Sequence, residues 1–152
     1  MGKLSKGERI ASVSAILLFA LMFFDWFDVK TINTSNLLSY FVGIESGKNA
    51  WEALYYISSV LGVTVFATLV VAAIRVTDLA HRSLVPLNAL IAMLGLGSAL
   101  LILFRIVDPP VFLVEPTFTY EGAVRFPMFF ALLAAAGIAF GGCMAMREER
   151  SI

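Results

Sequence analysis

Residues 53–74 read ALYYISSVLGVTVFATLVVAAI, an apolar stretch without a charged residue between Glu52 and Arg75. A helix needs roughly 20 such residues to cross about 30 Å of hydrocarbon. Inside lipid a helix satisfies its backbone hydrogen bonds within one segment, so we predict a helix here despite the many β-branched residues. This stretch therefore predicts a membrane-spanning helix, and it decides the fold class.

Three further stretches have the same character: one follows Arg9, one lies between Arg82 and Arg105, and one lies between Arg125 and Arg147. The composition agrees, since 60% of the chain is hydrophobic and 14% is charged, whereas soluble domains carry roughly one quarter charged residues. We predict one all-α domain, a polytopic membrane protein built as a four-transmembrane-helix bundle over residues 1–152. The predicted spans cover about residues 10–27, 50–74, 83–105 and 126–146.

Local residues agree with these boundaries. Asn49 followed by Glu52 is typical of an N-cap with a reciprocal partner, which predicts a helix start at Ala50. Pro86 and Pro127 fall within the first turn of the third and fourth spans, where a missing N–H costs little. Asp108-Pro109-Pro110 ends the third span.

The first span has an alternative reading as a cleaved secretion signal, because Lys3, Lys6 and Arg9 precede it. However, Phe-Phe-Asp-Trp-Phe follows instead of a small-x-small cleavage site, which favours a retained span. We expect its end to contribute to an aromatic belt at the outer interface. The belt residues are Phe23, Phe24, Trp26 and Phe27.

Orientation follows from the distribution of Lys and Arg over the two sides. Seven lie on the side of both termini: Lys3, Lys6, Arg9, Arg75, Arg82, Arg147 and Arg150. Four lie on the other side: Lys30, Lys48, Arg105 and Arg125. Because cytoplasmic segments carry the excess of positive charge, we predict that both termini are cytoplasmic.

Small residues recur at helical spacing and predict the faces on which the helices pack. The third span carries Asn88, Ala92, Gly95 and Ala99, and the fourth carries Ala134, Gly137, Gly141 and Ala145. We expect these two helices to approach closely. Packing within one chain is favoured over packing between two chains, although a GxxxG such as Gly137–Gly141 is also found at dimer interfaces.

The predicted spans contain few side chains suited to transport, catalysis or metal binding. Between residues 10–24, and in the uncharged stretches of the other three spans, no Asp, Glu, Lys, Arg or His occurs, which makes a pump or a coupled transporter less expected. Cys143 is the single cysteine and His81 the single histidine, so a disulfide, a multi-His metal site and a bis-histidine haem are all excluded within one chain. The net charge of zero gives no basic excess for nucleic acid. We expect no cofactor and no metal.

The outer side holds two segments of about 20 residues, near 28–48 and 106–125, long enough to be candidates for function. Within the second, residues 111–114 and 117–120 favour extended structure and predict a short hairpin. Charged residues converge on this rim, and we single them out as a candidate ligand or partner site: Asp25, Glu52, Arg105, Asp108, Glu121 and Arg125. Interfacial anchors and ion pairs, such as Arg105 with Asp108, are the favoured reading. Headgroup binding or acid–base chemistry is the alternative.

The layout resembles the small four-helix membrane proteins common in actinobacteria. The similar residues are Asn49-Ala-Trp51-Glu52, Arg105-Ile-Val-Asp108-Pro109-Pro110, and Gly137-Ile-Ala-Phe-Gly141-Gly142 with Ala145-Met-Arg-Glu-Glu149. This resemblance implies a bacterial plasma membrane and no particular activity.

We therefore expect a non-enzymatic membrane scaffold or accessory protein that acts through a protein partner or through self-association, surrounded by membrane lipids. The alternative is a lipid-binding or small-solute-passing protein with an outward-facing cavity.

Overall fold

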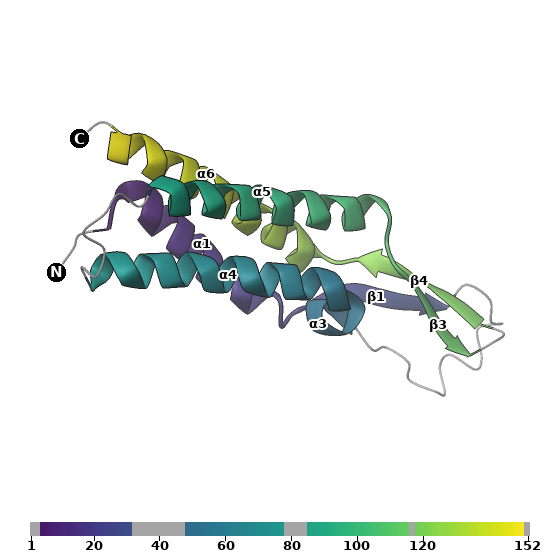
Figure 1. Cartoon of the computed structure of the whole chain (residues 1–152). Helices are drawn as coiled ribbons and strands as arrows, with labels where there is room; N and C mark the ends of the chain where they lie inside the picture. Colours follow the sequence, from purple (N-terminus) through teal and green to yellow (C-terminus); the bar gives the residue numbers. More distant parts are fainter. Residues whose placement is uncertain (1–3, 32–47, 78–84, 116–117, 151–152) are drawn as a thin grey trace.

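The computed structural model describes residues 4–31, 48–77, 85–115 and 118–150. Its helices are α1 (Lys6–Leu21), α3 (Ala50–Ala53), α4 (Tyr55–Val76), α5 (Val85–Val107) and α6 (Phe126–Arg150). Its strands are β1 (Asp25–Thr31), β2 (Lys48–Asn49), β3 (Val111–Glu115) and β4 (Phe118–Val124). The long helices lie side by side, and the sheet projects beyond one end of them (Figure 1). We call this the sheet end, and the end with both termini the terminal end.

Three of these helices are long and apolar enough to cross a membrane. They are α4, α5 and α6, with 22, 23 and 25 residues and mean hydropathies of 2.4, 2.4 and 2.0. At 1.5 Å per residue they extend for about 33 to 38 Å, more than the hydrocarbon core requires. The chain thus has the helices of a multi-pass membrane protein.

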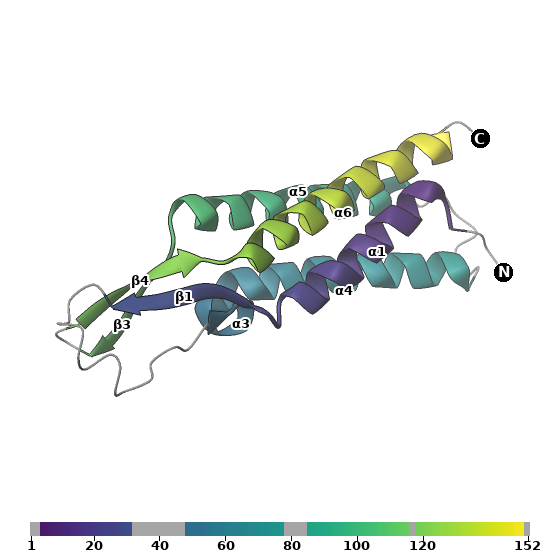
Figure 2. The same cartoon turned by 180° about the vertical axis from the view of Figure 1, so that it is seen from behind.

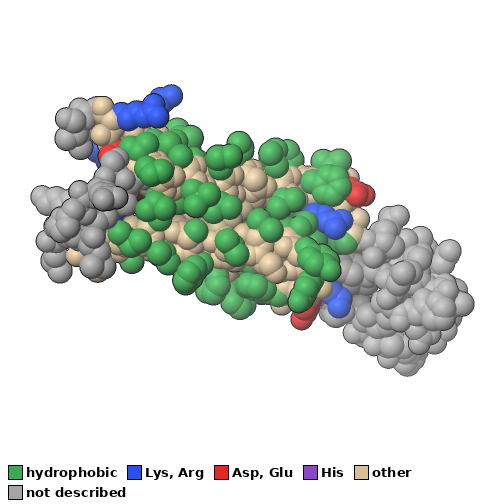
Figure 3. Space-filling view, viewed as in Figure 1, with side chains coloured by type: hydrophobic (Ala, Val, Ile, Leu, Met, Phe, Trp, Pro, Cys, Tyr) green, Lys and Arg blue, Asp and Glu red, His purple; other side chains and the backbone are tan. Residues whose placement is uncertain are grey.

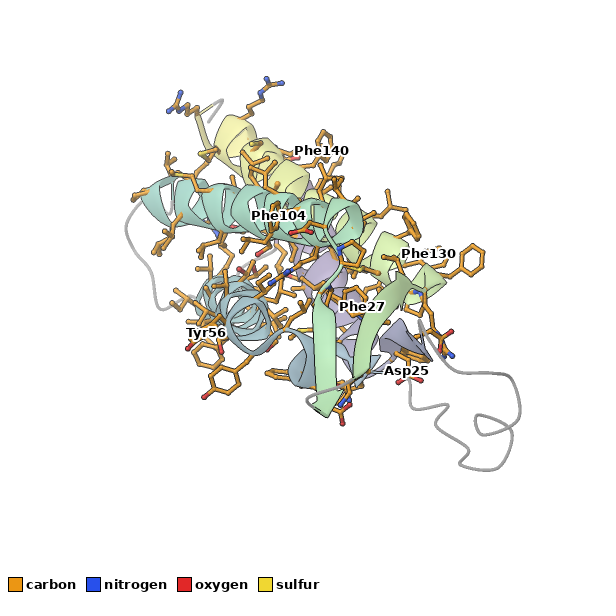
Figure 4. All side chains as sticks on the ribbon, turned by 90° about the vertical axis from the view of Figure 1, so that its right-hand side faces the viewer. Asp25, Phe27, Tyr56, Phe104, Phe130 and Phe140 are labelled. Atoms are coloured by element: carbon orange, nitrogen blue, oxygen red, sulfur yellow. The ribbon has the colours of Figure 1, made fainter. Side chains whose placement is uncertain are left out.

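The surface agrees with lipid contact. Large apolar side chains in the middle of the helices point outward, and Phe66 and Met93 are 71% and 73% exposed. Hydrophobic side chains cover the helical part in Figure 3, and Lys and Arg side chains lie towards its ends. An aromatic belt is also present at the sheet end, where Tyr56 is 83% exposed and points away from the helices (Figure 4). Its other exposed members include Phe23, Phe24, Tyr55 and Phe126.

The first helix differs from its predicted range of about 10–27. It begins earlier, because Ser5 and Glu8 form a complete capping box that caps α1 at Lys6. It ends at Leu21, and the chain then turns and enters β1 at Asp25. Trp26 donates from Nε1 to the Leu21 carbonyl at 2.8 Å. The extended backbone after the turn pairs with β4, a long-range contact that the apolar run itself does not reveal.

This change of direction moves two aromatic residues inside. Trp26 and Phe27 are 0% exposed, so their predicted place in the aromatic belt is wrong. They pack with Leu18, Met22 and Met128, which are also fully buried. Phe27 lies beneath the strands when the molecule is seen from the sheet end (Figure 4). These five side chains therefore form a buried apolar cluster at this end.

The second predicted span is interrupted near its start. Asn49 caps α3 by accepting from the Glu52 amide at 3.0 Å, as predicted, but the reciprocal bond of a capping box is not among the bonds of the described residues. Leu54 then adopts φ −135° and ψ 58°, a conformation outside the helix region, and α4 starts at Tyr55. The short helix α3 thus lies apart from the membrane-length helix α4.

The outer segments form a sheet that the all-α prediction omits. β3 and β4 make the expected antiparallel hairpin, with Phe112 opposite Tyr120. β4 also pairs with β1, with Phe27 opposite Val124, and the complete strand order is β2-β1-β4-β3. Strands from both outer segments therefore combine, which a hairpin in one segment does not imply. The chain is mostly helical with a four-stranded antiparallel sheet at one end.

Helix α6 lies between α1 and α5 and makes the closest contacts with both (Figure 2). A Cβ at Gly141 would lie 2.6 Å from the Ala11 nitrogen of α1. A Cβ at Gly95 of α5 would lie 2.6 Å from the Ala139 nitrogen of α6. The expected approach of the third and fourth spans is present, but the Gly137–Gly141 face packs on α1.

Helix α4 packs less closely, against α1 and α5. Thr64 of α4 and Ser98 of α5 are fully buried, and their hydroxyl oxygens are 2.9 Å apart. Such a bond between helices in lipid is worth roughly 1 kcal/mol. It fixes the antiparallel register of the α4–α5 pair.

Candidate functional site

The charged side chains of the structure gather at the two ends of the helices, and the two groups are built differently. At the sheet end, Arg125 lies just before α6, and its amide donates to the Trp26 carbonyl at 2.8 Å. Its guanidinium bonds to Asp28 and, at 3.4 Å, to Asp25. All three side chains are between 34% and 46% exposed. At that exposure each pair contributes about 0–1 kcal/mol.

Of the other predicted rim residues, Glu52, Arg105 and Asp108 do not join this group. Glu52 and Asp108 are exposed, and no salt bridge within the described chain includes either of them. Arg105 does not form the expected ion pair with Asp108, and its Nε is buried without a hydrogen-bond partner. Glu121 occupies β4 opposite Lys30 of β1. The structure thus brings together Asp25 and Arg125 and adds Asp28, which was not singled out from the sequence.

A second cluster, at the terminal end, was missed by the sequence interpretation. Arg75 of α4 donates from Nε to Glu8 Oε1 of α1 at 2.9 Å and from Nη2 to Glu149 Oε1 of α6 at 3.0 Å. Asn88 of α5 donates to the other oxygen of Glu149 at 3.4 Å. We call these four residues the terminal cluster. Every long helix contributes one of them.

The terminal cluster is much less exposed than the rim. Glu8 is 4% exposed and Asn88 is 1% exposed, and the side chains of Arg75 and Glu149 are 27% and 15% exposed. Glu8 also accepts from the Ser5 amide at 2.8 Å, which completes the capping box of α1. Desolvation offsets much of the attraction within a buried ion pair, so the intact pair adds little stability. Removing one partner nevertheless lowers the stability strongly, because the other charge stays buried.

A small cavity of about 10 Å³ lies beneath the cluster and is surrounded by all four long helices. Glu8, Ser12, Thr68 and Asn88 supply its polar lining. This volume is close to the minimum for one water molecule, and the lining offers polar partners for it. A cavity of this size cannot admit an organic substrate.

One signal for this cluster was present in the sequence. Ser5-x-x-Glu8 is a capping-box pattern, which would place the helix start at Lys6 and Glu8 in its first turn. Arg75 ends the second predicted span, on the side predicted for the N-terminus. Their pairing required the relative rotation of α1 and α4, which no local pattern contains.

The residues predicted for helix packing lie at helix contacts. Asn88, Ala92 and Gly95 are buried, and Ala99 packs at the edge of the core. Gly142 of α6 lies against Ala92, since a Cβ there would be 2.8 Å from the Ala92 nitrogen. The smallest residues therefore serve contacts inside the chain.

No cluster of three or more His, Cys, Asp or Glu side chains suited to a metal ion occurs among the described residues. Cys143 is an exposed free thiol on α6. His81 lies outside the described residues.

No protein-family model matches the chain, and no curated protein or solved structure is significantly similar to it. The resemblance to actinobacterial four-helix proteins therefore stays a prediction. The functional argument rests on the residues themselves.

Proposed function

We propose that α1 is a fourth transmembrane helix and that the chain forms a four-helix bundle in a bacterial plasma membrane, with both termini in the cytoplasm. The glycine-mediated packing of α1 on α6 supports this proposal. The 16 residues of α1 extend for about 24 Å. Residues 22–24 lengthen this apolar segment at the sheet end. The excess of Lys and Arg at the terminal end and the aromatic belt at the sheet end agree with this orientation.

We further propose that the protein is a non-enzymatic scaffold whose outer sheet recognises a protein partner or a second copy of the chain. The observation that carries this proposal is that the small-residue faces are already occupied within one chain. Gly137 and Gly141 pack on α1, and Gly95 and Gly142 join α5 to α6. The outer surface of the helices carries large apolar side chains that face lipid. We therefore assign recognition of a partner to the sheet.

The sheet has a feature suited to this role. Among the described strands, β3 has a single neighbour, β4, and so forms one edge. An edge strand presents backbone N–H and C=O groups that another strand can bind. The buried apolar cluster around Trp26 supports this scaffold role over passage of a solute.

Cross-linking of the full chain in nanodiscs tests the scaffold proposal. We replace Cys143 with Ser and introduce one cysteine in β3, Leu113→Cys, with the lipid-facing Phe130→Cys as the matched control. Self-association through the sheet predicts disulfide-linked dimers for Leu113→Cys only. Dimers at Phe130→Cys alone would place the contact on the helices and contradict the proposal.

If neither variant cross-links, native mass spectrometry of the wild-type chain purified from its own membrane supplies the second measurement. A co-purifying protein that is lost in Leu113→Pro supports heterotypic binding through the edge strand. A lone monomer without any such protein would refute the scaffold role.

A cysteine at the terminal end tests the orientation separately. Arg150→Cys in the Cys143→Ser background should react with an impermeant thiol reagent only after the cells are opened. Labelling of intact cells would reverse the proposed topology.

A further inference from the structure

Arg105 is a charged side chain at the sheet end that takes part in no described salt bridge. It lies near the sheet end of α5, three residues beyond the fully buried Ile102 and seven beyond the fully buried Ser98. This spacing places Arg105 on the inward face of α5, because residues three and seven apart lie on one side of a helix. Its Nε is buried, has no hydrogen-bond partner, and so keeps one donor unsatisfied.

Arg105 lies at the level of the N-terminal end of α4. The bond between Thr64 and Ser98 sets the register of the antiparallel α4–α5 pair. Arg105 follows Ser98 by seven residues, and Ile57, in the first turn of α4, precedes Thr64 by seven. Both residues therefore lie about 10 Å from that bond towards the sheet end and at the same height. The N-cap of α4 is Leu54, which provides no side-chain hydrogen bond. The N-terminus of α4, which has no side-chain cap, and the guanidinium of Arg105 therefore lie at the same height along the bundle. A helix N-terminus and a guanidinium both attract an anion.

No salt bridge among the described side chains pairs Arg105 with a carboxylate. Asp108 follows three residues later on α5, yet it is exposed and takes no part in the described salt bridges. The guanidinium carbon lies 5.8 Å from the centre of the Phe104 ring, a cation–π contact that leaves its N–H donors free. Arg125, at the same end, differs because its guanidinium already binds Asp25 and Asp28.

The apolar surface beside Arg105 indicates which anion fits. Phe104 on α5 is 55% exposed, and Tyr56 on α4 is 83% exposed and points away from the helices (Figure 4). Such side chains at an aromatic belt lie at the level where lipid headgroups join their acyl chains. An arginine binds phosphate through two parallel N–H donors, a geometry that a lysine cannot reproduce.

We infer that Arg105, at the level of the first turn of α4, binds the phosphate of a phospholipid whose acyl chains lie against Phe104 and Tyr56; that this lipid belongs to the outer leaflet rests on the orientation proposed above. This site is separate from the sheet edge that we propose for protein recognition, and it involves neither a pore nor the transfer of the lipid.

Native mass spectrometry of the delipidated full chain, titrated with defined lipids, tests this inference. Phosphatidylglycerol is the main probe, diacylglycerol with the same acyl chains lacks the phosphate, and inorganic phosphate lacks the acyl chains. We expect one phosphatidylglycerol to bind about tenfold more tightly than diacylglycerol, because charge-assisted hydrogen bonds are lost without the phosphate. Inorganic phosphate should not displace the lipid.

The variants separate this site from general attraction of lipid to positive charge. Arg105→Gln should lower the affinity for phosphatidylglycerol about tenfold, and Arg105→Lys should lower it by a smaller factor. Arg147→Gln, at an exposed arginine of the terminal end, should change it less than twofold. If Arg105→Gln does not fold, Arg105→Lys alone carries the comparison.

Several results would overturn the inference. These are equal binding of diacylglycerol and phosphatidylglycerol, an unchanged affinity in both Arg105 variants, or an equal loss in Arg147→Gln. Displacement of the lipid by millimolar inorganic phosphate would assign the site to a free anion instead.

Discussion

Removing the guanidinium of Arg75 tests whether the terminal cluster holds the helices together. Arg75 is the shared cation of two carboxylates, Glu8 on α1 and Glu149 on α6. In Arg75→Gln, Glu8 stays 4% exposed and keeps only the Ser5 amide among its present donors. The variant therefore leaves a buried carboxylate without its cation.

The magnitude follows from burial. Breaking a buried ion pair by removing one partner costs about 3–5 kcal/mol. The Arg75 side chain is 27% exposed, so water can partly replace it, and we expect a loss of about 3 kcal/mol. The double variant Glu8→Gln/Arg75→Gln removes both charges of the pair, so its loss should be smaller than the sum of the two single losses by about 1–3 kcal/mol.

The free energy of unfolding in bicelles, measured by steric trapping, gives these values in a bilayer-like medium. Arg147→Gln is the matched control, because its side chain is exposed on the same end and a loss within about 0.5 kcal/mol is expected. The reasoning fails if Arg75→Gln lies as close to the wild type as this control, or if the losses of the double variant are additive.

Three further predictions concern packing and the outer rim. Gly141→Ala should cost about 1–3 kcal/mol, because its Cβ would lie 2.6 Å from a backbone nitrogen of α1, whereas Gly97→Ala, with nothing within 4 Å, should be neutral or stabilising by the same unfolding assay. Equal effects would contradict the packing of α6 on α1. Trp26 is 0% exposed and Trp51 is 39% exposed, so acrylamide should quench the fluorescence of Trp51→Phe much less than that of Trp26→Phe. Comparable quenching would mean that the sheet end is open. Asp28→Asn should change the unfolding free energy by no more than about 1 kcal/mol, since the pair with Arg125 is half-exposed, and a loss above 2 kcal/mol would show that the rim is a structural element.

The two ends of the bundle carry charge for different reasons. At the sheet end, Arg125 is paired and partly solvated, whereas Arg105 keeps a buried donor without a partner. At the terminal end, the carboxylates and Arg75 are paired across helices. The paired groups are best explained by a structural role. We therefore propose Arg105 as the ligand-binding residue.

Features that depend on neighbouring residues could be predicted from the sequence. Hydrocarbon thickness sets the length of an uncharged stretch, so α4, α5 and α6 were expected close to where they occur. The cap at Asn49 and the hairpin of β3 with β4 follow from residue preferences over a few positions.

Features that join distant segments were decided only by the tertiary structure. The apolar run through Trp26 and Phe27 is compatible with a helix in lipid, but pairing of β1 with β4 turned the chain and buried both rings. The packing of α1, α4 and α6 brings Arg75 to Glu8 and Glu149, a pairing that the local sequence around Glu8 does not contain. Local hydrophobicity and charge determined that this chain has membrane-length helices, because the bilayer acts on each segment separately. Which side chains are buried, paired or left unpaired depended on the relative rotation of the helices, a property of the whole packed chain.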